Sequence, residues 1–129
     1  MINKNIYDSA LSLLSESVDS EDNEDLEERA PYLIAAFCSE CSEIDERLRK
    51  SEGQKEAEDF NPVWMPLDAR FPLVKRLAHP ASLYLAAMLI IDEDPTLSDK
   101  FYDMYCDEIS KIATSIPALL EPICDRYYQ

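Results

Sequence analysis

The sequence contains a single glycine and a single histidine, and this scarcity excludes several kinds of site. The phosphate-binding P-loop, the GxGxxG dinucleotide turn and the GxSxG nucleophile elbow each need at least two glycines, so Gly53 cannot supply them. One histidine also excludes most metallohydrolase schemes and those built on histidine pairs. Because His79 directly precedes Pro80, with neither a nucleophile nor an orienting acid apparent, we interpret it as a residue at a helix boundary.

Positive charge is scarce as well. The chain has 12 basic and 27 acidic residues, a formal net charge of −15 and an isoelectric point near 4.2. Such a surface repels nucleic-acid phosphates and anionic lipid headgroups, so we expect no sequence-specific nucleic-acid binding and no membrane association. No run of eighteen apolar residues is present, and the N-terminal residues do not resemble a secretion signal. We therefore expect a cytosolic protein.

The length and the apolar spacing indicate one all-α domain over residues 1–129. Hydrophobic residues make up 47% of the 129 residues, enough for a single core. Residues 81–91 are almost wholly apolar, which is typical of a helix at the centre of a bundle. Asp94 and Pro95 are placed as the N-cap and first residue of the next helix. We predict a compact bundle of four to five helices around the central helix at about 81–91.

The clearest helical pattern runs from Leu26 to Leu48 and predicts one helix of about six turns, ended by Gly53. Pro31 suits a first helical turn, which favours a start near Ala30 with a separate turn before it. A shorter amphipathic helix is expected over about 3–17.

Three segments fall outside the predicted helices. Residues 19–28 belong to an acidic stretch, Glu16 to Glu28, with eight carboxylates and no basic residue, and we interpret it as solvated and mobile. Residues 51–68 form a linker that contains two prolines and is the one place where short strand pairing is conceivable. Its apolar residues, Trp64 among them, are expected to pack partly on the core. Residues 118–129 form an apolar tail.

The four cysteines include a CxxC pair, Cys38 and Cys41, within the long predicted helix. A redox CxxC follows a strand at a helix N-terminus, and a zinc site needs four ligands, but Cys106 and Cys124 form no second close pair. We predict packed, reduced thiols and keep zinc binding and redox chemistry as minor alternatives.

The acidic residues offer no better metal site. Residues 19–30 fail the calcium-loop pattern because the sixth position is Glu24 and the twelfth is Ala30. The carboxylates of 92–94, with Asp99 and Asp103, could be imagined as a metal cluster, but we interpret them as helix caps and solvated side chains. We therefore predict no metal site, no cofactor and no catalytic residue.

Apolar residues outside the predicted core are the candidates for a protein interface. They either contact another subunit or fold back on the core of their own chain, and the sequence leaves both open. These candidates are Trp64 in the linker and Leu119, Leu120, Ile123, Tyr127 and Tyr128 in the tail.

Residues 31–113 contain, in order, an apolar LYLAAML block from Leu83, an acidic turn at 92–95 and a helix with the pair Phe101 and Tyr105. This order resembles the helical head–tail connector (adaptor) proteins of tailed bacteriophages. The resemblance implies a structural, non-enzymatic phage or prophage protein, a homo-oligomeric ring that joins the portal to tail or neck proteins. DNA would pass through its channel. Such a protein is located in the host cytoplasm before assembly and then in the virion. The acidic stretch Glu16–Glu28 has no counterpart in the family pattern.

Two other functions are weighed. A small acidic helical binding module, such as a regulator or a DNA-mimic-like inhibitor, would place carboxylates in a cationic groove of its partner. The stripe from Asp99 to Asp107 is short for that purpose. An enzyme could use a carboxylate pair as acid and base, but the sequence contains no pocket signature, so we expect none.

Overall fold

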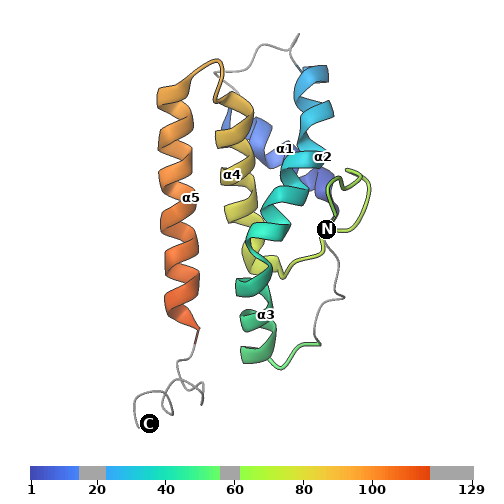
Figure 1. Cartoon of the computed structure of the whole chain (residues 1–129), viewed down its shortest axis with the longest axis vertical. Coiled ribbons are helices and arrows are strands. Elements are labelled where there is room, and N and C mark those ends of the chain that lie inside the picture. The colour runs from blue at the N-terminus through green and yellow to red at the C-terminus, as the bar shows by residue number, and fades with distance from the viewer. Residues whose placement is uncertain (15–22, 56–61, 117–129) are drawn as a thin grey trace.

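A computed structural model describes residues 1–14, 23–55 and 62–116, and in this part the chain is an all-α bundle (Figure 1). The predicted fold class is confirmed. Its only β-type pairing among the described residues is an isolated bridge between Ile2 and Arg70. The elements are α1 (Asn3–Leu13), α2 (Asn23–Glu40), α3 (Ser42–Ser51), the 3-10 helix η2 (Lys75–Leu77), α4 (Ala78–Ile90) and α5 (Pro95–Ser115).

Helix α4 is the centre of the bundle, as predicted for residues 81–91. Ten of its thirteen residues are buried. It packs against α1, α2, α5 and η2, and Figure 1 shows it enclosed between α5 on one side and α1 and α2 on the other. Ala86 and Ala87 are fully buried, and so are the leucines of α4, so side chains of both sizes pack in the core around this helix. The apolar composition of α4 is thus explained by burial on nearly every side.

The prediction of one long helix from Leu26 to Leu48 is wrong, because the chain is interrupted at Cys41. This residue has φ −100° and ψ 10°, and it separates α2 from α3. The adjacent Ser42 hydroxyl donates to the carbonyl of Ser39 at 3.1 Å. A serine side chain that bonds the preceding turn competes with the helical backbone and bends it. Periodicity cannot detect the break, since both helices keep their apolar residues on the same face.

The predicted start of this helix near Ala30 is wrong too. Helix α2 begins at Asn23, and Pro31 lies inside it. The interpretation of residues 19–28 as a mobile segment is therefore wrong for 23–28, which are helical, whereas 19–22 lie outside the described residues. An interior proline removes one backbone hydrogen bond and costs about 3 kcal/mol in a helix. Leu26 and Ala30 are both buried, so core packing of the turns before Pro31 offsets that cost.

Two predicted helix ends are confirmed. The Asp94 carboxylate accepts the backbone N–H of Leu97 at 3.1 Å, and Pro95 is the first residue of α5. Gly53, with φ 69°, follows α3, where its N–H and that of Gln54 return to the last turn of the helix. This 6→1 and 5→2 pairing is a Schellman motif, and its positive φ favours glycine.

The linker packs on the molecule through the beginning of α1. The backbone N–H groups of Asn3 and Lys4 donate to the carbonyls of Ala69 and Leu67 at 2.8 and 2.7 Å. The Asn3 side chain donates to the carbonyl of Pro66 at 2.9 Å. Loop carbonyls therefore satisfy N–H groups that the first turn of a helix leaves without intrahelical partners. The predicted partial packing of the linker is confirmed for Met65 and Leu67, which pack on the core, but it is wrong for Trp64, which is half-exposed.

Candidate functional site

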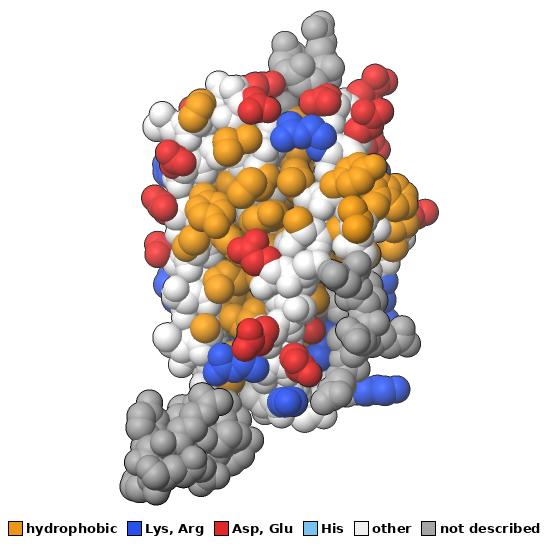
Figure 2. Space-filling model, in the orientation of Figure 1, with side chains coloured by type: hydrophobic (Ala, Val, Ile, Leu, Met, Phe, Trp, Pro, Cys, Tyr) orange, Lys and Arg blue, Asp and Glu red, His pale blue; other side chains and the backbone are white. Residues whose placement is uncertain are grey.

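Trp64 is half-exposed and belongs to a small apolar surface. Met65 donates its N–H to the carbonyl of Pro31 at 3.2 Å, which holds this part of the linker against α2 beside Tyr32. The exposed fractions are 50% for Trp64, 79% for Val63 and 56% for Tyr32. Figure 2 shows hydrophobic side chains gathered where this loop meets α2. We call Tyr32, Val63 and Trp64 the Trp64 patch.

The other predicted interface residues cannot be placed. Leu119, Leu120, Ile123, Tyr127 and Tyr128 lie outside the described residues, as does Cys124. Their role as interface residues stays a prediction.

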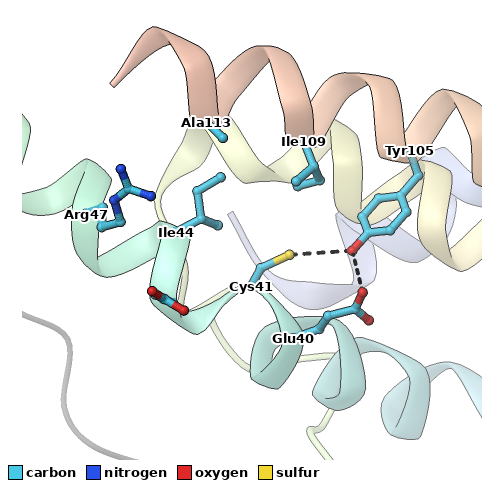
Figure 3. Close-up of a pocket in the computed structure, with 8 residues that line it drawn as sticks. Glu40, Cys41, Ile44, Arg47, Tyr105, Ile109 and Ala113 are labelled. Atoms are coloured by element: carbon cyan, nitrogen blue, oxygen red, sulfur yellow. Dashed lines mark hydrogen bonds between the residues drawn. The ribbon is translucent and has the colours of Figure 1, made fainter. Parts of the chain in front are cut away.

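A second surface feature is an open cavity of about 300 Å³ between α3 and α5 (Figure 3). We call it the α3–α5 groove. Its apolar wall is formed by the half-buried Ile44, Ile109 and Ala113. Charged, exposed side chains lie along its edge, and these are Glu40, Glu43 and Arg47. A volume of this size is at the lower limit of sites that hold small molecules, and the openness of the groove suits a peptide side chain better.

One end of the groove contains a short chain of hydrogen bonds between α2 and α5. The Tyr105 hydroxyl donates to Glu40 Oε1 at 3.1 Å, and the Cys41 Sγ atom lies 3.7 Å from the same hydroxyl oxygen (Figure 3). A tyrosine hydroxyl has one proton, which is used on Glu40, so the Cys41 thiol is the donor to Tyr105. The hydrogen bonds thus run from the buried Cys41 thiol through the Tyr105 hydroxyl to the exposed Glu40 carboxylate, and they link the two helices.

The cluster is not activated for nucleophilic chemistry. Burial raises the pKa of Cys41 to about 11, although the Tyr105 hydroxyl, which can donate to the thiolate form, partly offsets the shift. Burial also raises the pKa of Tyr105 above its ordinary value. Both groups therefore keep their protons near neutral pH, whereas a nucleophilic cysteine needs a lowered pKa. The hydrogen bonds instead have a structural role, because they connect the end of α2 to α5.

The cysteines divide between core and surface. Cys38 and Cys41 are buried free thiols, and burial raises the pKa of Cys38 to about 12, so the packed-thiol prediction is confirmed for this pair. It is wrong for Cys106, which is exposed on α5. The reason is the helical period, which turns Cys106 away from the face that buries Tyr105.

Aromatic rings connect the core to the groove. Phe37 and Tyr84 have ring centroids 5.7 Å apart, Tyr84 and Tyr105 are 5.3 Å apart, and Tyr105 and Tyr102 are 5.5 Å apart. Tilted and edge-on pairs of this kind are favourable. Of these rings only Tyr105 lines the groove, and its ring contacts with Tyr84 and Tyr102 hold it in place. The sequence contained little sign of the contact between Glu40 and Tyr105, because the two residues are far apart in the chain. Only the spacing of Phe101 and Tyr105 indicated which face of this helix is buried.

The remaining predicted positions lie at the surface. His79 is exposed in the first turn of α4, as a boundary residue would be. Asp99, Asp103 and Asp107 are exposed along α5. Within residues 1–14, 23–55 and 62–116, no three histidine, cysteine or acidic side chains are placed to hold a metal ion together. None of the described helices combines the length and the apolar character needed to cross a bilayer.

Comparison with known proteins identifies no relative: no family model, no curated protein and no solved structure matches the chain. The candidate site consists of the two surfaces described above, the Trp64 patch and the α3–α5 groove.

Proposed function

We propose that this chain is a structural subunit of a phage or prophage particle, a head–tail connector that joins the portal to the tail by ring assembly. The observation that carries the proposal is the Trp64 patch. The bundle already encloses its central helix, and Tyr32, Val63 and Trp64 remain exposed on its surface. Their exposure therefore does not contribute to the stability of the described fold. Exposed aromatic side chains gathered on one surface are typical of protein interfaces.

The mechanism is burial of apolar surface between subunits. Tryptophan and tyrosine are the residues that most often dominate interface energies. A head-to-tail contact closes into a ring when the rotation between subunits divides the circle, and each stable contact needs on the order of 1,000 Å². The net charge of −15 agrees with a channel through which DNA slides, since an acidic wall forms few phosphate contacts.

The test compares the mass of the full chain with that of a Trp64→Asp variant by light scattering at several concentrations. We expect the wild type to form a ring and the variant to shift toward monomer, because an aspartate cannot be buried unpaired. Ile91→Asp is the matched control. Ile91 is 45% exposed on the turn between α4 and α5, so this change should leave assembly intact.

Connectors can stay monomeric until they meet the portal, so gene neighbourhood provides the second readout. We expect portal, capsid and tail genes beside this one. A wild-type chain that stays monomeric, encoded among genes of unrelated kinds, would contradict the proposal.

A small acidic binding module is the second candidate, and the exposed carboxylates of α5 favour it. Asp99, Asp103 and Asp107 follow one another at four-residue spacing along the helix. They span about 12 Å, which corresponds to only three or four base pairs of DNA, so mimicry of a longer duplex would need further groups. Tight binding to a cationic nucleic-acid-binding protein, weakened strongly by salt, would favour this function over ring assembly.

A further inference from the structure

We propose that the α3–α5 groove binds the C-terminal segment, residues 118–129, of a neighbouring copy of this chain. The inference rests on the proposed function, because it specifies which surfaces of adjacent subunits meet. It also stands on an observation independent of the Trp64 patch, namely an apolar groove that no described residue fills.

The groove offers an apolar seat with a charged edge. Ile44 on α3 and Ile109 and Ala113 on α5 point into the same space in Figure 3, and all three are only partly buried. Covering them removes further apolar surface from water, at about 25 cal/mol per Å².

The chain itself contains a segment of matching character that begins beside the groove. The last described residue, Ile116, is three positions beyond Ala113, and thirteen residues follow it (117–129). They include five large apolar side chains, Leu119, Leu120, Ile123, Tyr127 and Tyr128. Extended, thirteen residues reach about 45 Å, which exceeds the length of about 32 Å expected for the 21-residue helix α5. The segment is therefore long enough to meet another molecule.

Charge supports the same occupant. The groove edge carries Glu40 and Glu43 together with Arg47. The segment carries both signs, with Glu121 and Asp125 opposite in charge to the arginine and Arg126 opposite in charge to the glutamates. Opposite charges at the rim of an apolar contact fix its register more than its affinity.

The direction of the backbone favours a neighbouring copy over the segment's own groove. Ile116 is extended, with φ −73° and ψ 127°, as expected for the residue before a proline. Ala113 lines the groove just before α5 ends, so a segment returning to it must reverse within a few residues of Pro117. Entry from another copy needs no reversal, and it makes a head-to-tail contact that a ring requires.

The test uses the native Cys124 of the segment in the full-length chain. Cys106→Ser removes the exposed thiol, and Ala113→Cys places a thiol in the groove. After mild oxidation with copper–phenanthroline, we expect covalent dimers and larger multimers on a non-reducing gel. Ile91→Cys is the matched control and should give few cross-links, because Ile91 precedes the first turn of α5 whereas the groove lies along residues 105–113. Adding Ile109→Asp should reduce the cross-linked fraction about tenfold.

Each outcome decides. A disulfide within one chain, seen as a compact monomer, would place the segment in its own groove and overturn the assignment to a neighbour. Cross-linking no stronger than in the Ile91→Cys control would overturn the whole inference. Multimers that form only open chains by electron microscopy would uphold the groove contact but contradict the connector. Rings that form without the groove cross-link would support the connector but contradict the groove contact.

Discussion

The buried Asp45 and the partly buried Arg49 form an ion pair one turn apart on α3, and the pair attaches the loop before η2 to this helix. Asp45 Oδ2 lies 2.9 Å from Arg49 Nε, and the other carboxylate oxygen accepts the N–H of Val74 at 2.7 Å. Arg49 also donates to the carbonyl of Pro72 at 2.8 Å. A charge buried in this way is tolerated because every oxygen has a partner.

Replacing Asp45 should therefore destabilise the fold strongly. We expect Asp45→Ala to lower the free energy of unfolding by about 3 kcal/mol, and Asp45→Asn by less, since the amide oxygen can still accept from Val74. The control is Asp25→Ala, which breaks another i,i+4 pair, to Arg29 at 3.9 Å, in which Asp25 is 71% exposed. That change should cost less than about 0.5 kcal/mol. Urea denaturation measures all three variants, and equal losses for Asp45→Ala and Asp25→Ala would refute the structural role.

The N-cap of α5 makes a smaller prediction. Asp94→Ala removes the acceptor for the N–H of Leu97 and should lower stability by about 1 kcal/mol. Asp94→Asn keeps an oxygen at the same place and should retain most of the stability. Thermal denaturation followed by circular dichroism distinguishes the two. If both variants melt alike, well below the wild type, charge rather than capping is responsible.

The close packing around α4 predicts that a larger side chain at its centre is harmful. Ala86 is fully buried, so Ala86→Leu should force the helices apart and cost about 1–3 kcal/mol. Ala36→Leu is the matched change at an exposed position of α2, and its effect should be close to zero. Chemical denaturation measures both. A neutral Ala86→Leu would mean that the space around α4 is looser than the structure indicates.

The buried thiols make stability fall in alkaline solution. Burial raises the pKa of Cys38 to about 12 and that of Cys41 to about 11, from an ordinary value of 9.0. Between these values the unfolded chain loses thiol protons that the folded chain keeps, so the folded state binds more protons. The free energy of unfolding is then fully maintained below about pH 9 and declines above it, by up to about 1.4 kcal/mol per pH unit for each thiol.

Urea titrations at about pH 8 and pH 10 check this decline. Cys38→Ala removes one of the two thiols and should make the loss between the two pH values smaller than in the wild type. Buried tyrosines, whose pKa values are also raised by burial, act in the same direction in both proteins. An identical pH dependence in the variant would contradict the assignment to Cys38.

Local signals in the sequence predicted the ends of some helices and the centre of the fold. A helix that is apolar on every side, as at 81–91, is stable in water only when it is buried on every side. Asp94 followed by Pro95 is typical of the start of a helix. The break at Cys41 was missed because it depends on one hydrogen bond, from the Ser42 hydroxyl to the Ser39 carbonyl. The spacing of apolar residues contains no sign of that bond.

The candidate site was only partly accessible to such reasoning. Trp64 was singled out as an apolar residue beside prolines, and the structure shows it half-exposed, but its association with Tyr32 depends on the contact between Met65 and Pro31. The groove was not predicted at all. It forms where α3 and α5 diverge, and the separation of two helices far apart in sequence cannot be deduced from either one.

The enclosure of α4 has a consequence for synthesis of the protein. A chain emerging from the ribosome presents α4 before α5 exists, although α5 is one of the elements that cover it. Until the last described helix is complete, an apolar segment remains exposed to water and to other nascent chains, a state that invites aggregation or chaperone binding. During synthesis the chain therefore passes through an incomplete intermediate with exposed apolar surface before the bundle closes around α4.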